Sequence, residues 1–441
     1  MPTSRKRTKR RRKIRFPVLI LGICLVCAVL LLITGLILRG CGKTEQEHPG
    51  SETASETPAA VQIQDSSDYS QFVGHKIRTS EQCELFLVSA DGMEPCGHVA
   101  AGALFDISGT KEGGYLEVSD SPFCIPGSAA EASDRWYRND TNLIPYAEDL
   151  TTNDSFTLSD EAGNPVLTSE RSLTFPVYVK PGEDNRYGIR FMNGIYYVDA
   201  SSVKEVQAAD RSAEATAQEV PVLMYHFFYS EAEGGTRIDG NYVEVNELDE
   251  QLNYIHEQNF HACTMREILY WMEGRANLPE KSIAITIDDA DPSVHQYAMP
   301  VFVKYGLHAT NFVICGWRPA EMPYELWEMR ENGLELQSHG FLTHTGGCSG
   351  MGHGGLLLCM DHESGVEDVK RSFDYVDGGF VFCYPFGDIN DNAENIVRDA
   401  GGKLAFTTEG GRIHPGMDPL ALPRVRVTGG NGLSAFAASI G

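Results

Sequence analysis

Short apolar segments alternate with amphipathic stretches from about residue 221 to the end of the sequence. The apolar segments are four to six residues long and rich in β-branched or aromatic residues, which predicts buried strands. Between them, apolar residues recur at the spacing of one helical face, as at Leu248, Leu252 and Ile255. Strands alternating with helices favour an α/β fold, here a distorted (β/α)7 barrel over residues 206–441. Seven strands are expected: 221–225, 282–287, 309–314, 334–338, 380–384, 403–406 and 423–427.

Residues 75–205 follow a different pattern, with short β-like runs broken by Gly, Asp, Asn and Pro. The pattern recurs at an offset of about 72 residues, so that 115–118 corresponds to 187–191 and 123–125 to 196–198. We therefore expect a β-rich, internally duplicated region. Its turn spacing and aromatic positions resemble a pair of bacterial SH3-like barrels, which in that family often occur in cell-wall proteins. The alternative is a β-rich spacer with no ligand of its own.

The first 74 residues share neither pattern. Residues 5–15 contain nine Lys or Arg, and the 22 residues 17–38 carry no charge. As a helix that run spans about 33 Å, enough to cross a hydrocarbon core of about 30 Å. The sequence thus predicts a basic cytoplasmic tail (1–16), a single-pass transmembrane anchor in the cell membrane (17–38) and an extracellular catalytic part, with a cleaved signal peptide as the alternative. Residues 39–74, rich in Ser, Thr and Glu, predict a disordered linker.

Charge excludes one class of partner. The net charge is −25, and residues 1–40 hold ten Lys or Arg and no acid, so the rest of the chain carries −35. Such an acidic body is unsuited to nucleic acid but tolerates a metal ion or a cationic polymer. The nine cysteines outside the apolar run lack zinc-ribbon spacing. Cys348 and Cys359 flank a Gly-rich loop, and both a disulfide outside the cell and free thiols remain open for them.

Ionisable residues directly follow two of the predicted strands. Asp288 and Asp289 come after the second strand, and His339 comes after the fourth, with His344 five residues later. Burying an unpaired carboxylate costs several kcal/mol, so packing does not account for the Asp pair. Ligand groups collect at the C-terminal ends of the strands in such barrels, where His226 and Tyr384 are also expected. Two Asp and two His there predict a metal site with a spare carboxylate.

Three segments resemble the signature motifs of polysaccharide deacetylases, the NodB-homology group or carbohydrate esterase family 4. They are Thr-Ile-Asp-Asp at 286–289, Ser-His-Gly-Phe-Leu-Thr-His at 338–344 and Tyr-Pro-Phe-Gly at 384–387. The opening at 221–226 is similar to the poly-N-acetylglucosamine and peptidoglycan deacetylase-like branch. The resemblance covers residues 221–430 and implies a metal-dependent deacetylase of a GlcNAc-containing polysaccharide, peptidoglycan or an exopolysaccharide. With the predicted anchor, its N-acetylated glycan polymer would lie outside the cell.

The resemblance also implies a role for each motif residue. Asp288 is the expected general base. A divalent metal, zinc by default with cobalt or nickel as alternatives, is expected to be held by Asp289, His339 and His344. Such an ion lowers the pKa of bound water and polarises an amide carbonyl. The wall around the developing oxyanion is expected at the strand end formed by Tyr384, Pro385, Phe386 and Gly387.

The sequence departs from the family pattern at three places. Ala290 stands where a Gly usually follows the Asp pair, which matters if the position needs a positive φ. Cys383 stands where many members have an Arg that orients the base, so that role is unfilled or met elsewhere. The late Leu-x-His motif, which supplies the general acid, is not visible. His226 is our expected acid, and His414 is a weaker choice.

Two further features complete the expectations. The Gly-rich loop 346–355 is expected to be a mobile flap near the metal. Trp317 and Trp327 are expected in the core, with stacking on sugar rings as the alternative. The missing motifs also leave a second function open, a catalytically inactive cell-wall-binding protein that uses SH3-like repeats and a degenerate deacetylase barrel.

Overall fold

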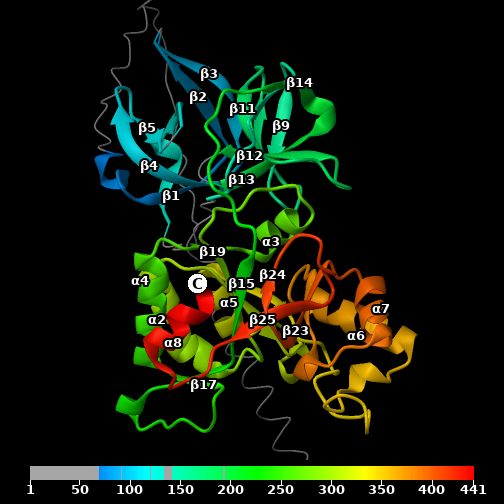
Figure 1. The fold of residues 1–441 in the computed structure, drawn as a ribbon. Helices are drawn as coiled ribbons and strands as arrows, with labels where there is room; N and C mark the ends of the chain where they lie inside the picture. The colour runs from blue at the N-terminus through cyan, green and yellow to red at the C-terminus, as the bar shows by residue number, and fades with distance from the viewer. Residues whose placement is uncertain (1–68, 91, 120, 134–141, 192–193) are drawn as a thin grey trace, which may run out of the picture. The chain divides into compact units, whose positions relative to one another are not determined.

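The computed structural model describes residues 69–441 apart from 91, 120, 134–141 and 192–193 (Figure 1). The predicted tail and anchor, and the predicted linker as far as residue 68, lie outside the described residues. Every helix within the described part of the chain is too short or too polar to span a bilayer.

Seven parallel strands close into a barrel in the C-terminal half (Figure 1). Consecutive strands pair along the sequence, and the ring closes because β15 pairs with both β19 and β25. All six residues of β15 and all six of β19 are buried, which explains their continuous apolar sequence. The seven predicted strands are therefore confirmed. They are β15 (Val220–Tyr225), β19 (Ser282–Ile287), β20 (Ala309–Val313), β21 (Leu334–Ser338), β22 (Val381–Cys383), β23 (Leu404–Gly410) and β25 (Leu422–Arg426).

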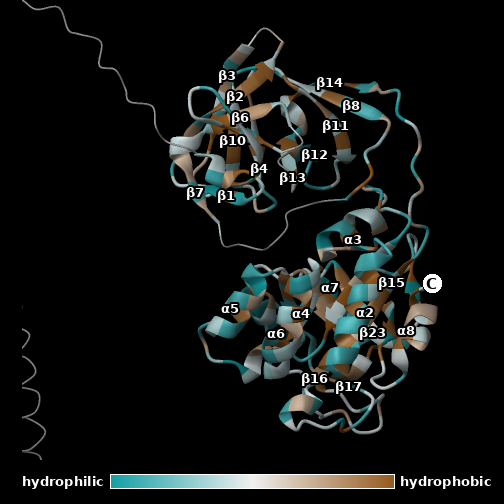
Figure 2. Cartoon of the chain, turned by 90° about the vertical axis from the view of Figure 1, so that its left-hand side faces the viewer, coloured by the Kyte–Doolittle hydropathy of each residue, from teal (hydrophilic) through white to brown (hydrophobic). Residues whose placement is uncertain are grey.

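Helices cover the outside of the barrel, with brown apolar strands inside and teal polar helix faces outside in Figure 2. On α2 the predicted face of Leu248, Leu252 and Ile255 is buried. α3 begins with a capping box between Thr264 and Glu267. The helices are α2 (Val245–Glu257), α3 (Met265–Met272), α4 (Met299–Tyr305), α5 (Tyr324–Glu331), α6 (His362–Tyr375), α7 (Asp391–Asp399) and α8 (Gly432–Ile440).

Fourteen strands are described in the region before the barrel, and their pairing is duplicated. In the first set β1 pairs with β4 and β7, β2 with β3 and β6, and β5 with β4 and β6. The strands β8 to β14 repeat this scheme in the same order. The internal repeat is therefore present, whereas its assignment to SH3-like barrels stays a prediction.

The strands of the first repeat are β1 (Lys76–Thr79), β2 (Cys83–Ser89), β3 (Gly92–Val99), β4 (Leu104–Lys111), β5 (Tyr115–Val118), β6 (Phe123–Pro126) and β7 (Ala130–Ala132). Those of the second are β8 (Glu148–Thr152), β9 (Phe156–Ser159), β10 (Pro165–Ser169), β11 (Thr174–Val179), β12 (Arg186–Phe191), β13 (Gly194–Asp199) and β14 (Val203–Ala208).

The two repeats share one apolar core. The equivalent strands β3 and β10 pair antiparallel, and the rings of Phe123 and Phe191 meet edge to face at 5.3 Å. The expected linker ends too late at residue 74, because Tyr69–Phe72 form a 3-10 turn and Phe72 is buried in this core. These two aromatic residues supply apolar surface that the preceding segment lacks.

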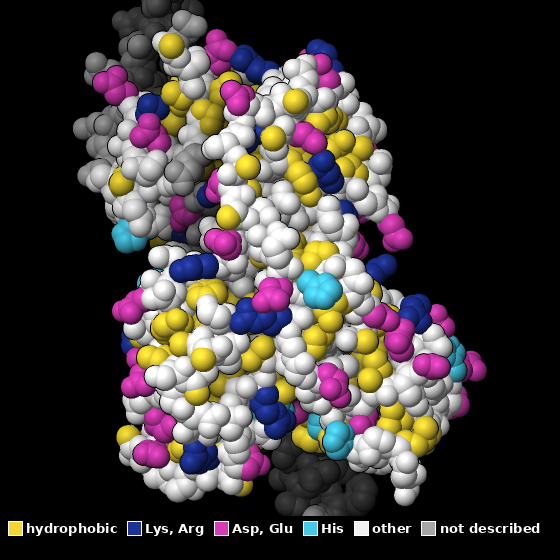
Figure 3. Space-filling view, viewed as in Figure 1, with side chains coloured by type: hydrophobic (Ala, Val, Ile, Leu, Met, Phe, Trp, Pro, Cys, Tyr) yellow, Lys and Arg dark blue, Asp and Glu magenta, His cyan; other side chains and the backbone are white. Residues whose placement is uncertain are grey.

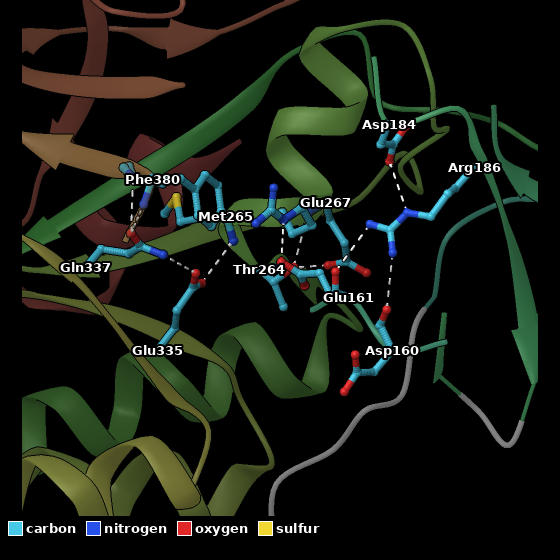
Figure 4. Close-up of polar contacts among 12 residues, drawn as sticks. Asp160, Glu161, Asp184, Arg186, Thr264, Met265, Glu267, Glu335, Gln337 and Phe380 are labelled. Carbon is cyan, nitrogen blue, oxygen red and sulfur yellow. Dashed lines mark hydrogen bonds and ion pairs between the residues drawn. The ribbon is translucent and has the colours of Figure 1, made fainter. Parts of the chain in front are cut away.

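A polar network surrounds the start of α3, at the N-terminal ends of the barrel strands (Figure 4). Glu335 of β21 accepts hydrogen bonds from the amide of Met265 and the side chain of Gln337. Burial alone would raise the pKa of Glu335, but the hydrogen bond from His308 and its other donors outweigh burial and lower it. Arg266 of α3 pairs with Glu161 of the second repeat at 2.5 Å. Elsewhere, acidic and basic side chains are interspersed over the face shown in Figure 3.

The close approach of the repeats predicts a strict size limit at Gly97. A Cβ there would lie 2.2 Å from the carbonyl oxygen of Thr168, so Gly97→Ala must displace backbone. We expect a loss of about 1–3 kcal/mol and a lower melting temperature in calorimetry. Gly410→Ala, where a Cβ meets nothing within 4 Å, is the matched control. Equal melting temperatures for the two variants would contradict the proposed packing.

Candidate active site

The C-terminal ends of the barrel strands bring the four predicted side chains together. Asp289 Oδ1 lies 3.5 Å from Nε2 of His339 and 3.4 Å from Nε2 of His344. The two imidazole rings are 4.6 Å apart. Asp288 lies beside them and is 2% exposed. Residues distant in sequence thus meet because parallel strands end at the same rim.

The orientation of His339 fits a metal ligand. Its Nδ1 lies 2.7 Å from the carbonyl oxygen of Cys383. A carbonyl only accepts, so Nδ1 donates to it, and Nε2, which faces Asp289, is the ring atom that would bind a metal. The donor atoms of Asp289, His339 and His344 lie within 4.8 Å of one another. Two imidazoles and one carboxylate match a zinc site that keeps coordination positions open.

The charge state of Asp289 also suits a ligand. Burial raises the pKa of its carboxyl, but hydrogen bonds from His339 and His344 outweigh burial, and the net pKa is well below the usual value. The carboxylate is therefore ionised in any neutral solution.

Arg424 fills the role left open by Cys383. From β25, its Nη1 and Nη2 donate to Oδ1 and Oδ2 of Asp288, both at 2.7 Å. The guanidinium is fully buried, and it also donates to Thr286 and to the carbonyl oxygen of Thr407. Such a bidentate pair fixes both the charge and the orientation of the carboxylate.

Arg424 determines the protonation of Asp288. Burial alone would raise the pKa of this carboxyl, but the charge of Arg424 and its hydrogen bonds lower it to about 2. Sequence reasoning missed Arg424 because 136 residues separate it from Asp288. The available signal was an arginine flanked by the apolar residues Pro423 and Val425 in a predicted strand, because an arginine buried there requires a buried anion.

Ala290 adopts a positive φ, so an alanine at this position, where the family usually has a glycine, strains the backbone. The φ angles of Asp289 and Ala290 are 73° and 51°. An L-residue other than Gly, Asn or Asp costs about 1–2 kcal/mol in this region. The turn that presents Asp289 is therefore strained.

Of the two candidate acids, the structure places only His226 at the site. Its Nε2 lies 3.8 Å from Oδ2 of Asp288. Burial lowers the pKa of His226, although Asp288 and Asp289 oppose this effect. His414 follows Ile413, which pairs with Val220 at the N-terminal end of β15. It therefore lies at the opposite end of the barrel, and its candidacy is wrong.

The predicted oxyanion wall is only partly available to a ligand. Tyr384 is fully buried and its hydroxyl donates to the carbonyl oxygen of Leu420. The amide of Gly387 donates to the carbonyl oxygen of Tyr384, and Pro385 has no amide hydrogen. Among the described residues, no acceptor is found for the amide of Phe386. Phe386 is 39% exposed, and its ring is centred 4.8 Å from the ring of His344.

The Gly-rich loop beside this wall is tethered at two points. Cys348 and Cys359 form a disulfide, one of the two states left open by the sequence. Asp388 accepts hydrogen bonds from the amides of His353 and Gly355 and from the ring of His353. These contacts hold the loop against the segment that carries Phe386.

The two tryptophans lie on the surface, so the prediction of core packing is wrong. Trp317 is 66% exposed and Trp327 is 44% exposed. Trp317 follows the end of β20, and its ring is centred 5.4 Å from the ring of His344. Trp327 lies on α5 beside the exposed Tyr324. Positions on a loop and an outer helix face explain why neither reaches the core.

The buried ion pair predicts a non-additive effect on stability. Arg424→Leu leaves the Asp288 carboxylate buried and unpaired, and we expect a loss of about 3–5 kcal/mol. Arg424→Leu/Asp288→Leu removes both charges and is expected to regain most of that stability in urea denaturation. Arg330→Leu, which breaks the exposed pair with Asp377, should change stability by less than about 1 kcal/mol. If Arg424→Leu were as stable as Arg330→Leu, the assignment of a buried ion pair would be contradicted.

The tether at Asp388 predicts acid resistance of the loop. Burial would raise the pKa of Asp388, but the amides of His353 and Gly355 and the His353 ring outweigh it and hold the pKa below 3.8. The ionised carboxyl therefore stabilises the loop fully at pH values above its pKa in the unfolded chain, about 3.9. This stabilisation is lost as the pH falls through the lower pKa of the folded protein. Carbon NMR titration of the Asp388 carboxyl measures the shift. A midpoint at or above the ordinary value would refute the tether.

Residues 275–405 match the family model described as polysaccharide deacetylase. A Bacillus subtilis protein, YxkH, provisionally named a polysaccharide deacetylase, is 28% identical over 230 residues, covering 50% of this chain and 76% of its own. The poly-beta-1,6-N-acetyl-D-glucosamine N-deacetylase of Staphylococcus aureus is 25% identical over 217 residues, covering 46% and 72%. The solved structure of IcaB from Ammonifex degensii is 23% identical, covers 52% of this chain and 100% of its own, and has a TM-score of 0.44.

Proposed function

The barrel of this chain belongs to the polysaccharide deacetylase family, and we propose that it removes N-acetyl groups from a GlcNAc-containing polysaccharide with the help of a divalent metal. The polymer would be peptidoglycan or an exopolysaccharide outside the cell, reached from an anchor at residues 17–38. The observation that carries the proposal is the meeting of Asp288, Asp289, His339 and His344 at one rim of the barrel. The named Staphylococcus aureus relative supports the poly-N-acetylglucosamine class of substrate.

Asp288 is suited to act as the general base. Because its pKa is about 2, the carboxylate is ionised throughout the neutral range and can accept a proton from an attacking water. The bidentate contact with Arg424 keeps both oxygens in place while the proton moves. A base with so low a pKa needs an acidified water, and that acidification is the chemistry a divalent ion supplies when bound by Asp289, His339 and His344. Zinc suits these ligands, with cobalt or nickel as alternatives.

His226 and Phe386 complete the proposed machinery. His226 lies beside Asp288, so its ring can pass a proton onward to the leaving amine nitrogen. A lowered pKa makes its protonated form a stronger acid. The amide of Phe386 can donate to the negatively charged oxygen that develops on the carbonyl carbon.

The surface around the site suits a sugar ring. Trp317, Leu342 and Phe386 are all exposed apolar side chains, and Trp317 and Phe386 both contact His344. An apolar surface beside a reactive centre is typical of a ligand site rather than of ordinary solvent-facing surface. The flat faces of the aromatic rings match the C–H face of a pyranose.

The alternative, an inactive wall-binding protein, loses its main support. Its motivation was the missing Arg and the missing late His. Arg424 occupies the position that orients Asp288, and His226 supplies an imidazole beside it. Wall binding by the β-rich repeats remains compatible with an active barrel.

Acetate release tests the proposal directly. The full chain with added zinc is expected to release acetate from oligomers of N-acetylglucosamine, and chelation is expected to abolish release until zinc is restored. Asp288→Asn should lower the rate by about 10²–10⁴-fold, because it removes the general base. His344→Ala should lose both activity and bound zinc, whereas the exposed His362→Ala should keep both. Release from no glycan, or equal rates for wild type and Asp288→Asn, would reject the function.

A further inference from the structure

The loop that follows β20 contains no proposed metal ligand, yet it contacts both segments that do, the turn after β19 and the segment after β21. Its amide at Cys315 donates to the carbonyl oxygen of Gly340, and that at Gly316 donates to Phe341, both within the segment between His339 and His344. A Cβ at Gly316 would lie 2.0 Å from the Phe341 oxygen, so only glycine permits this approach. The next residue, Trp317, packs its ring against that of His344.

Arg318 completes this set of contacts at the strained turn. Its Nη2 donates to the carbonyl oxygen of Asp289 at 2.9 Å and to that of Ala290 at 2.5 Å. These are the carbonyls of the two consecutive residues with positive φ. Two carbonyl oxygens that converge on one point repel each other unless a donor lies between them, and a guanidinium supplies a permanently charged one.

Within the described residues, both hydrogen bonds of the Arg318 side chain go to this turn. Its Nε is buried and has no hydrogen-bond partner among the described residues. A buried unsatisfied donor is unfavourable, so the side chain is held there by what its Nη2 contributes. That contribution goes entirely to the turn carrying Asp289.

We propose that Arg318 is a positioning residue of the metal centre: it holds the Asp289–Ala290 turn in its left-handed conformation and thereby compensates for the alanine at position 290. A glycine there would adopt a positive φ without strain and would need no such support. Arg318 and Ala290 are therefore energetically coupled. This inference rests on the proposed metal site and adds the group that shapes it.

The coupling predicts a specific pattern of metal affinity. Arg318→Met keeps the aliphatic length and removes the donor, and we expect the dissociation constant for zinc to rise about tenfold, the lower end of the range for groups that orient ligands. In Arg318→Met/Ala290→Gly the constant should return to within about twofold of the wild type. Ala290→Gly alone should stay close to wild type. Arg330→Met, which changes a partly exposed arginine on the neighbouring α5, is the matched control and should leave the constant unchanged.

The measurement is competition between the full chain and a zinc-sensitive chelating dye, with the visible spectrum of the cobalt-loaded protein as a second readout. Loss of the donor should shift the cobalt absorption bands, and Ala290→Gly should restore them. A purely structural role would lower stability without this rescue. If Arg318→Met does not fold, Arg318→Lys with and without Ala290→Gly is judged by the same criterion, because lysine has the charge but not the forked geometry.

The possible results distinguish a failure of the proposed metal site from a failure of the proposed role of Arg318. A wild-type chain that binds no zinc or cobalt contradicts the metal site itself. Zinc bound equally well by the wild type and Arg318→Met leaves the metal site intact and overturns the role of Arg318. A double variant as weak as Arg318→Met also overturns it, because the arginine would then act other than through the turn.

Discussion

The buried ion pair between Arg424 and Asp288 is the interaction on which the rest of the site depends. A carboxylate at the end of a fully buried strand is tolerated only with a compensating charge, and Arg424 supplies that charge with two hydrogen bonds of 2.7 Å. The pairing joins β19 to β25, which both flank β15 in the closed barrel. The ionised state of Asp288, the proposed base, therefore depends on the closure of the barrel. Burial has the largest effect on the pKa of the neighbouring His226, and Asp288 and Arg424 shift that pKa in opposite directions.

Strain beside the ion pair sets the second constraint. Asp289 is presented from a turn that also forces Ala290 into a left-handed conformation. Rigid support is needed there because a ligand that moves by a fraction of an ångström loses metal affinity. The loop after β20 provides it through backbone contacts and through Arg318. A loop without any proposed ligand thus becomes part of the site, and it also carries the exposed side chain of Trp317.

The sequence predicted the parts of the molecule whose signals are local. Apolar segments such as 282–287 and 334–338 revealed the barrel strands, and the spacing of repeated aromatic residues revealed the duplicated β-rich region. The Asp pair and the two histidines followed from polar residues at strand ends. Arg424 was missed because its partner is distant in sequence, and the positive φ of Ala290 was left open because backbone conformation in a turn depends on tertiary contacts. Trp317 and Trp327 were misplaced because an aromatic residue alone does not distinguish a core from a binding surface.

The central claim is that one cation is held between Asp289, His339 and His344. Anomalous diffraction at the zinc absorption edge, from crystals of the zinc-loaded protein, tests it most directly. We expect a strong anomalous peak within coordination distance of Asp289 Oδ1 and both Nε2 atoms, with Asp288 beside it and still paired with Arg424. A zinc-loaded crystal with no peak at these atoms, or with its peak instead at another group of possible ligands, His261, Cys263 and Glu267, would contradict it.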